Sequence, residues 1–310
     1  MKLFTSKNNK NSRSEKPIKN QKSLNQKSIT LFFFAVLLAS TTWQSCDLEE
    51  EPIPSYIQID TVLVTTNGVQ GSASHKISAV QVAAGAQSLG IFPLPATIPV
   101  LEYGTQNIVV DPIVVESGIS AIRELYPFYT RYTTTGDLTE GEVLQVNPQV
   151  TYNSDANFVF VENFDGGNSF VDDLDGDPGT RIEVSFDDVF EGSGSGKITL
   201  NETGSQAFVG TGLFYTLPTS GERVYLEMNY KCNTNFTIGF RAMQNVNGAT
   251  VDVDILTLIP REEWNKIYVS LNQEASASNG DRFQIYIKMA KSDDVGFSEL
   301  VMDNIKLIHQ

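Results

Sequence analysis

The chain has 310 residues, with 22 Lys and Arg against 37 Asp and Glu and a formal net charge of −15 at pH 7. This acidic excess argues against nucleic acid as a partner, because phosphate groups are bound mainly by Lys and Arg. Only two histidines occur, His75 and His309, so nucleophile–histidine catalysis and histidine-rich metal sites are not supported.

Residues 1–45 have the layout of an export signal. Eight Lys and Arg come first, and the apolar run 29–39 follows them. A membrane-spanning helix needs about 20 apolar residues, and this run supplies about half that number. We therefore interpret residues 1–45 as a signal peptide that is removed. Its loss takes away eight of the 22 basic residues and one of the 37 acidic ones, which leaves a formal charge of −22.

Cys46 stands directly after this signal. The arrangement resembles the processing site of bacterial lipoproteins, although Trp43 and Gln44 depart from the residues usual at those two places. The resemblance implies that the mature protein begins at Cys46 and carries fatty acyl chains such as palmitate. Each buried methylene contributes about 0.8 kcal/mol, so two or three chains anchor a protein durably. The alternative is an ordinary secretory signal with a cysteine nearby.

Residues 46–55 are predicted to form an acidic tether. The acids Asp47, Glu49, Glu50 and Glu51 resemble the export tag that Bacteroidota place after the lipidated residue. That resemblance implies a lipid-anchored protein of the cell outer membrane that faces the cell exterior. The alternative is a solvated acidic linker. Prolines at 52 and 54 would stiffen the tether.

Residues 56–152 are predicted to form a β-sandwich that is rich in Pro and Gly. Leu89-Gly90, a strand bounded by prolines at 93, 95 and 99, and a turn at Gly104 occur in this order. The order resembles PEGA-like and other small immunoglobulin-like surface modules over about 25 residues, which implies a spacer or a site of protein contact. The predicted strands are residues 57–65, 76–83, 87–94, 96–101, 106–110, 120–124, 126–132 and 142–146.

Residues 156–310 follow a short polar boundary at 153–155 and show clear strand alternation. Alternate apolar residues recur in many short segments separated by turns, which is typical of an antiparallel sandwich of two sheets. We predict an all-β protein whose second domain is a jelly roll of the galactose-binding-like kind. The clearest predicted strands are residues 224–230, 236–240, 251–255, 267–271, 283–289 and 300–308. Cys232, with no histidine nearby, is predicted to be a small buried filler.

An aspartate-rich loop, residues 172–179, could hold a hard cation, because several carboxylates alternate along it before a glycine kink. With the upstream segment 162–167, it resembles the opening of cleaved-adhesin, MAM-like and carbohydrate-binding jelly rolls, which often hold a structural calcium. The resemblance implies four ligands, Glu162, Asp173, Asp175 and Asp303. The alternatives are a solvated acidic turn and, for Asp303, a hydrogen-bonded cap.

Three tyrosines, Tyr225, Tyr268 and Tyr286, alternate with the buried positions of the second domain. We predict that they face outward or line a concave sheet, where aromatic faces could stack on sugar rings. The alternative is cross-strand packing.

These features predict a non-enzymatic, lipid-anchored surface protein whose jelly roll binds a glycan or a protein. The rival hypothesis is a structural accessory that docks on an outer-membrane β-barrel transport or secretion complex. A glycosidase built on paired carboxylates stays a third possibility, since the acids are plentiful and their spacing in space is not visible in sequence.

Overall fold

A computed structural model describes residues 51–244 and 248–310. Residues 52–310 form one compact unit. Every regular element within the described residues is a strand, apart from the six-residue helix α2 (Asn272–Ala277). The predicted all-β class is therefore confirmed. No helix in the described part of the chain is long and apolar enough to span a membrane.

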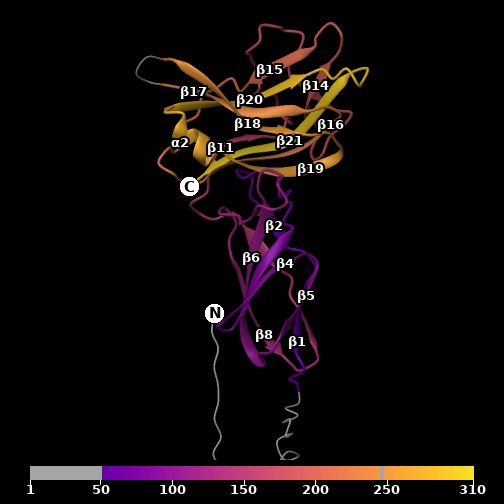
Figure 1. Cartoon of the computed structure of the whole chain (residues 1–310), viewed down its shortest axis with the longest axis vertical. Coiled ribbons are helices and arrows are strands. Elements are labelled where there is room, and N and C mark those ends of the chain that lie inside the picture. The colour runs from indigo at the N-terminus through magenta and orange to yellow at the C-terminus, as the bar shows by residue number, and fades with distance from the viewer. Residues whose placement is uncertain (1–50, 245–247) are drawn as a thin grey trace, which may run out of the picture. The chain divides into compact units, whose positions relative to one another are not determined.

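The N-terminal half of this unit contains sheets of three, two and five strands (Figure 1). Its strands are β1 (Ser55–Ile59), β2 (Leu63–Thr65), β3 (Ala79–Ala84), β4 (Gln87–Pro93), β5 (Ala96–Val100), β6 (Gly104–Val115), β7 (Arg123–Leu125), β8 (Tyr132–Leu138), β9 (Val143–Gln145) and β10 (Gln149–Thr151). β1 pairs antiparallel with β5 and parallel with β9, and β2 pairs parallel with β10. β3 lies between β4 and β6, and β6 also pairs with β7 and β8.

The C-terminal half is a sandwich of two sheets, as predicted. Its strands are β11 (Asn157–Glu162), β12 (Asp172–Asp173), β13 (Glu183–Ser185), β14 (Ser195–Leu200), β15 (Gln206–Gly210), β16 (Val224–Cys232), β17 (Phe236–Met243), β18 (Thr250–Leu258), β19 (Arg261–Ser270), β20 (Arg282–Ala290) and β21 (Ser298–His309). One sheet has the order β13-β14-β21-β16-β19, with β11 also on β21. The other has the order β12-β15-β20-β17-β18.

Alternation places one set of side chains between the two sheets. Met228, Ile238, Ile267 and Ile287 belong to a single buried cluster, as their strands predicted. Burying apolar surface stabilises the sandwich by roughly 25 cal/mol per Å². Cys232 is buried, as predicted, and it has no disulfide partner in the part of the chain that the structure describes.

Two predicted strands of the N-terminal half are wrong. Residues 57–65 were expected to form one strand, but they contain the end of β1 and all of β2, which belong to different sheets. Residues 126–132 were expected in a strand, but the strand is β8, and it begins only at Tyr132. The aromatic residues Tyr126, Phe128 and Tyr129 lie before it and are buried. They pack on the C-terminal sandwich, so their alternation reflects a contact between the two halves rather than a strand.

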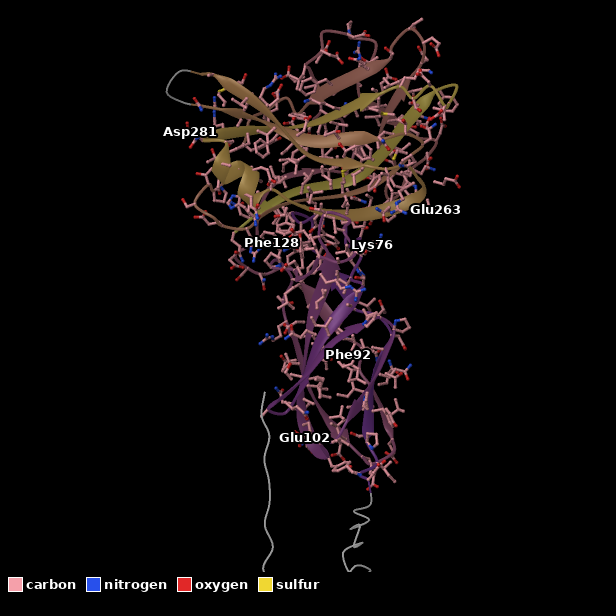
Figure 2. All side chains as sticks on the ribbon, in the orientation of Figure 1. Lys76, Phe92, Glu102, Phe128, Glu263 and Asp281 are labelled. Carbon is pink, nitrogen blue, oxygen red and sulfur yellow. The ribbon has the colours of Figure 1, made fainter. Side chains whose placement is uncertain are left out.

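The core of the N-terminal half extends onto the C-terminal sandwich. Tyr225, Tyr268 and Ile308 share one hydrophobic cluster with the N-terminal strands. Tyr126 packs edge-on against Tyr225 at 5.5 Å and against Tyr268 at 4.8 Å between ring centroids. Figure 2 labels Phe128 in this aromatic contact. The outer face of β16, β19 and β21 is therefore covered by the N-terminal half.

Candidate functional site

Two of the three tyrosines predicted to face outward, Tyr225 and Tyr268, are buried under the N-terminal half. The Tyr225 hydroxyl donates to the Glu116 carboxylate, and the Tyr268 hydroxyl accepts from the backbone N–H of Lys76 at 2.9 Å. Both tyrosines do point away from the core of their own sandwich. The prediction of exposure is nevertheless wrong, because another part of the chain occupies the surface that they would offer to a sugar.

The same covered face holds a buried charge cluster around Glu227. Its carboxylate accepts hydrogen bonds from Tyr126 at 2.6 Å and Tyr152 at 2.9 Å, and Lys266 Nζ lies 2.9 Å from Oε2. Burial alone would raise the pKa of the Glu227 carboxyl, but Lys266 and Lys306 hold that pKa below its ordinary value. This cluster joins the two halves, and its charged side chains are almost fully buried.

The outer face of the other sheet carries Tyr286, and here the sheet is not covered by the N-terminal half (Figure 1). Tyr286 is nevertheless fully buried. It stands between Gly210 on β15 and Gly239 on β17, and a Cβ on Gly239 would come within 2.4 Å of its ring. The glycines thus let the ring lie against the sheet. Its hydroxyl donates to Asp254 at 2.6 Å. Its predicted exposure is wrong as well.

Phe208 on β15 is the aromatic residue that this face does present, since its side chain is half-buried. Its ring packs edge-on against the Tyr286 ring at 4.9 Å. Sequence reasoning missed Phe208, although the alternation in β15, with Ala207 and Val209 in the core, places it on the outer face.

A cavity of about 670 Å³ opens beside Phe208. Its polar lining comes mainly from the side chains of Gln206, Asn235, Thr237, Thr257, Lys288 and Asp175. The hydroxyls of Thr237 and Thr257 are 2.8 Å apart across β17 and β18. Burial raises the pKa of the Asp175 carboxyl, which stands at the cavity wall. The surface therefore offers one aromatic ring among hydroxyl and amide groups. Lys288 and Arg241 also lie over the Phe208 ring, at 4.6 and 5.5 Å from its centroid.

The cations beside this cavity are already paired. Lys288 Nζ lies 2.7 Å from Asp254, and Arg241 donates twice to Asp252, at 2.6 and 3.0 Å. Hydrogen bonds from Lys288 and Tyr286 lower the pKa of the Asp254 carboxyl. Each of these two cations therefore has its own carboxylate, whereas Asp175 in the cavity wall has no cation within ion-pair distance among the described residues.

The four predicted calcium ligands do not come together. Glu162 accepts from the backbone N–H groups of Phe164 and Ser169, both at 2.7 Å. Asp303 accepts from those of Glu191 and Asn304 at 3.1 and 2.7 Å.

Asp173 and Asp175 lie near each other in the aspartate loop, where each accepts a backbone N–H of the same loop, from Gly176 and Asp177 respectively. Among the described residues, no group of three or more His, Cys, Asp and Glu is placed to hold a metal ion. These acids therefore cap backbone groups in this structure, and calcium binding stays a prediction. The predicted lipidation site, Cys46, lies outside the described residues.

No family model matches the chain, and no curated protein matches it. Among solved structures, it is similar to the C-terminal family 22 carbohydrate-binding module of a Clostridium thermocellum protein, with 12% identity over 51% of this chain and 96% of that one, at a TM-score of 0.35. It is also similar to a xylan-binding domain from Paenibacillus barcinonensis, with 13% identity over 51% of this chain and 97% of that one, at a TM-score of 0.36. A third similar structure is a family 30 carbohydrate-binding module of a Clostridium thermocellum cellulase, with 16% identity over 49% of this chain and 92% of that one, at a TM-score of 0.33. The C-terminal half is thus similar to β-sandwich carbohydrate-binding modules, and at these identities and TM-scores the likeness carries nothing about a ligand.

Proposed function

We propose that the protein is a non-catalytic binding protein that holds a neutral carbohydrate on the outer face of β15, β20, β17 and β18. The observation that carries this proposal is the half-buried Phe208 beside a cavity lined by hydroxyl and amide groups. A sugar ring has C–H faces that pack on an aromatic ring and equatorial hydroxyls that need donors and acceptors.

The pairing of charges favours a neutral ligand. Lys288 and Arg241 are bound to Asp254 and Asp252. An anionic sugar would have to compete with these carboxylates, whereas a neutral one needs only the free hydrogen-bonding capacity of groups such as Gln206 and Asn235. The volume of the cavity, about 670 Å³, suits a short stretch of a chain rather than a single ring.

The anchoring part of the proposal rests on sequence alone. Acylation of Cys46 would fasten the protein to the outer membrane, and the acidic tether would carry the β-sandwiches away from it. Intact-mass analysis of the protein from its native host tests this part independently. If the mature amino terminus carries no acyl chains, the proposed anchor is wrong, whereas the binding proposal is unaffected.

The binding proposal is tested by titrating the full-length chain in detergent with xylan, cellulose-derived and other neutral oligosaccharides. Phe208→Ala should weaken binding at least tenfold, which corresponds to about 1.4 kcal/mol. Phe186→Ala is the matched control, because Phe186 is 74% exposed and does not line the cavity.

If Phe208→Ala and Phe186→Ala bind the oligosaccharides with equal affinity, the proposed binding site at Phe208 and on this face is wrong. Co-purification of a β-barrel protein that persists in Phe208→Ala would support the accessory role instead.

A further inference from the structure

A second cavity, of about 310 Å³, lies where the N-terminal half meets β18 and β19. Its walls come from both halves of the compact unit and include Lys76, Ser78, Ser117, Tyr230, Arg261 and Lys266. Figure 2 labels Lys76 in the N-terminal half and Glu263 on β19. None of the residues that line the Phe208 cavity belongs to it except Thr257.

Backbone hydrogen bonds fix the walls of this cavity. Glu116 bridges to Tyr268 on β19, and Ser117 N–H donates to the Tyr268 carbonyl at 2.7 Å. Ser117 and Gly118 both adopt left-handed backbone conformations, with φ of 52° and 71°, and so turn the loop over the edge of β19. The cavity is therefore built by the contact of the two halves and does not exist in either alone.

Positive charge collects around the second cavity, in a chain with an acidic net charge. Three cationic side chains line it, Lys76, Arg261 and Lys266. Lys266 is paired with Glu227, but among the described residues neither Lys76 nor Arg261 has a carboxylate within ion-pair distance. Burial, followed by the charge of Arg261, lowers the pKa of the Lys76 ammonium. An anion placed between these two groups would relieve their repulsion.

Several polar groups face this cavity without a full set of partners. Ser78 Oγ is buried and has no hydrogen-bond partner among the described residues. Lys266 is 5% exposed and has only its ion pair with Glu227. Asn265 accepts from Lys76, and both Asn265 and Arg261 contact the Tyr230 hydroxyl. Buried donors without acceptors cost about 1–3 kcal/mol each, which a ligand oxygen would offset.

We propose that the second cavity binds a small organic oxyanion, with a carboxylate or sulfate group between Lys76 and Arg261 and a hydroxylated body against Ser78 and Ser117. Arg261 can give a planar oxyanion two parallel hydrogen bonds, and Lys76 adds a point charge. The volume admits about one sugar ring, at the lower end of small-molecule sites. An acidic monosaccharide therefore fits both the charge and the size. This site does not depend on the function proposed for the Phe208 cavity.

The test is calorimetric titration of the full-length chain with glucuronate, glucose 6-sulfate and glucose at low ionic strength. At least one of the anions should bind, whereas glucose should not bind in this cavity. Added salt should weaken the binding of the anion, because it screens the attraction to the two cations. Binding of glucuronate alone assigns the ligand as a carboxylate, and binding of the sulfate alone assigns it as a sulfate ester. Because glucose could enter the Phe208 cavity, all titrations are repeated in Phe208→Ala, which should leave the affinity for the anion unchanged.

The double variant Lys76→Gln/Arg261→Gln should lose at least tenfold in affinity for the anion. Both side chains lie at exposed positions, so the fold should persist, and the melting temperature checks this. The control is Arg131→Gln/Lys197→Gln, which removes the same charge at two surface ion pairs elsewhere. The proposal is overturned if neither anion binds at millimolar concentration, or if the two double variants lose affinity equally.

Discussion

The two outer faces of the C-terminal sandwich carry similar residue types, but one is buried and the other is open to solvent. One, on β16, β19 and β21, presents Tyr, Lys and Glu side chains and is buried under the N-terminal half. The other, on β15, β20, β17 and β18, presents a similar mixture and keeps a cavity open to solvent. Both follow from the same period-two alternation.

The difference lies in how each face uses its charges. On the covered face, Glu227, Lys266 and Lys306 are 0%, 5% and 0% exposed, so each depends on the others for solvation. On the open face, Lys288 and Asp254 remain partly in water, at 31% and 57% side-chain exposure. The same chemical groups therefore hold two halves together on one side and shape a binding surface on the other.

The largest expected effect tests the covered face. Glu227→Gln keeps the volume of the side chain but leaves Lys266 and Lys306 without their carboxylate. Breaking a buried pair in this way costs about 3–5 kcal/mol in the free energy of unfolding, measured by urea denaturation. The matched change on the open face, Asp254→Asn, should cost less than about 1 kcal/mol, because that pair is exposed. Equal losses would contradict the contrast between the two faces.

A second prediction concerns the packing of Tyr286. Gly239→Ala places a Cβ 2.4 Å from the Tyr286 ring, and such overpacking should cost about 1–3 kcal/mol in the free energy of unfolding. Gly166→Ala is the control, because nothing lies within 4 Å of its new Cβ. If the two variants unfold at the same urea concentration, Tyr286 is not held against the sheet as described.

A third prediction uses pH. Burial raises the pKa of Asp303 from its ordinary 3.8 to about 6. Between these values the folded protein keeps a proton that the unfolded chain has lost, so the contribution of this residue to stability falls as pH rises, by about 1–3 kcal/mol. Asp303→Asn should make the free energy of unfolding depend less on pH in this range. Asp254→Asn is the control of opposite sign, because a lowered pKa gives stability that is lost as pH falls.

The same residue offers a test of the calcium prediction. A bound cation would stabilise the charged carboxylate, so adding calcium should remove the loss of stability between pH 4 and 6. Chelation should then lower the melting temperature of the full-length chain. A transition that is the same in calcium and in chelator would contradict a structural ion at Asp303.

The smallest expected effect concerns salt. Because Lys288 and Arg241 are paired within the protein, added salt should change the affinity of the open face for a neutral oligosaccharide by less than about twofold. The second cavity, with unpaired Lys76 and Arg261, should respond strongly to the same salt. Parallel titrations of neutral and anionic sugars measure this contrast directly.

Much of the fold could be predicted from the sequence, and little of the candidate site. Alternation identified the inner faces of β16, β17 and β20, because burial of apolar residues has the period of the strand. It also placed Tyr225, Tyr268 and Tyr286 opposite the core. It could not tell that the N-terminal half covers Tyr225 and Tyr268, or that glycines on the neighbouring strands let Tyr286 lie buried against its own sheet. It also missed Phe208, which lies in a short strand with a single outward aromatic residue.

The sequence by itself determined an all-β chain, the side of each strand that faces the core and the excess of negative charge. These properties follow from local periodicity and composition. Which outer face is covered, which cations are paired and where cavities remain were decided only by the tertiary structure, because they depend on residues far apart in the chain. Tyr126 and Glu227, 101 positions apart, meet in one buried hydrogen bond, and no local pattern records that meeting.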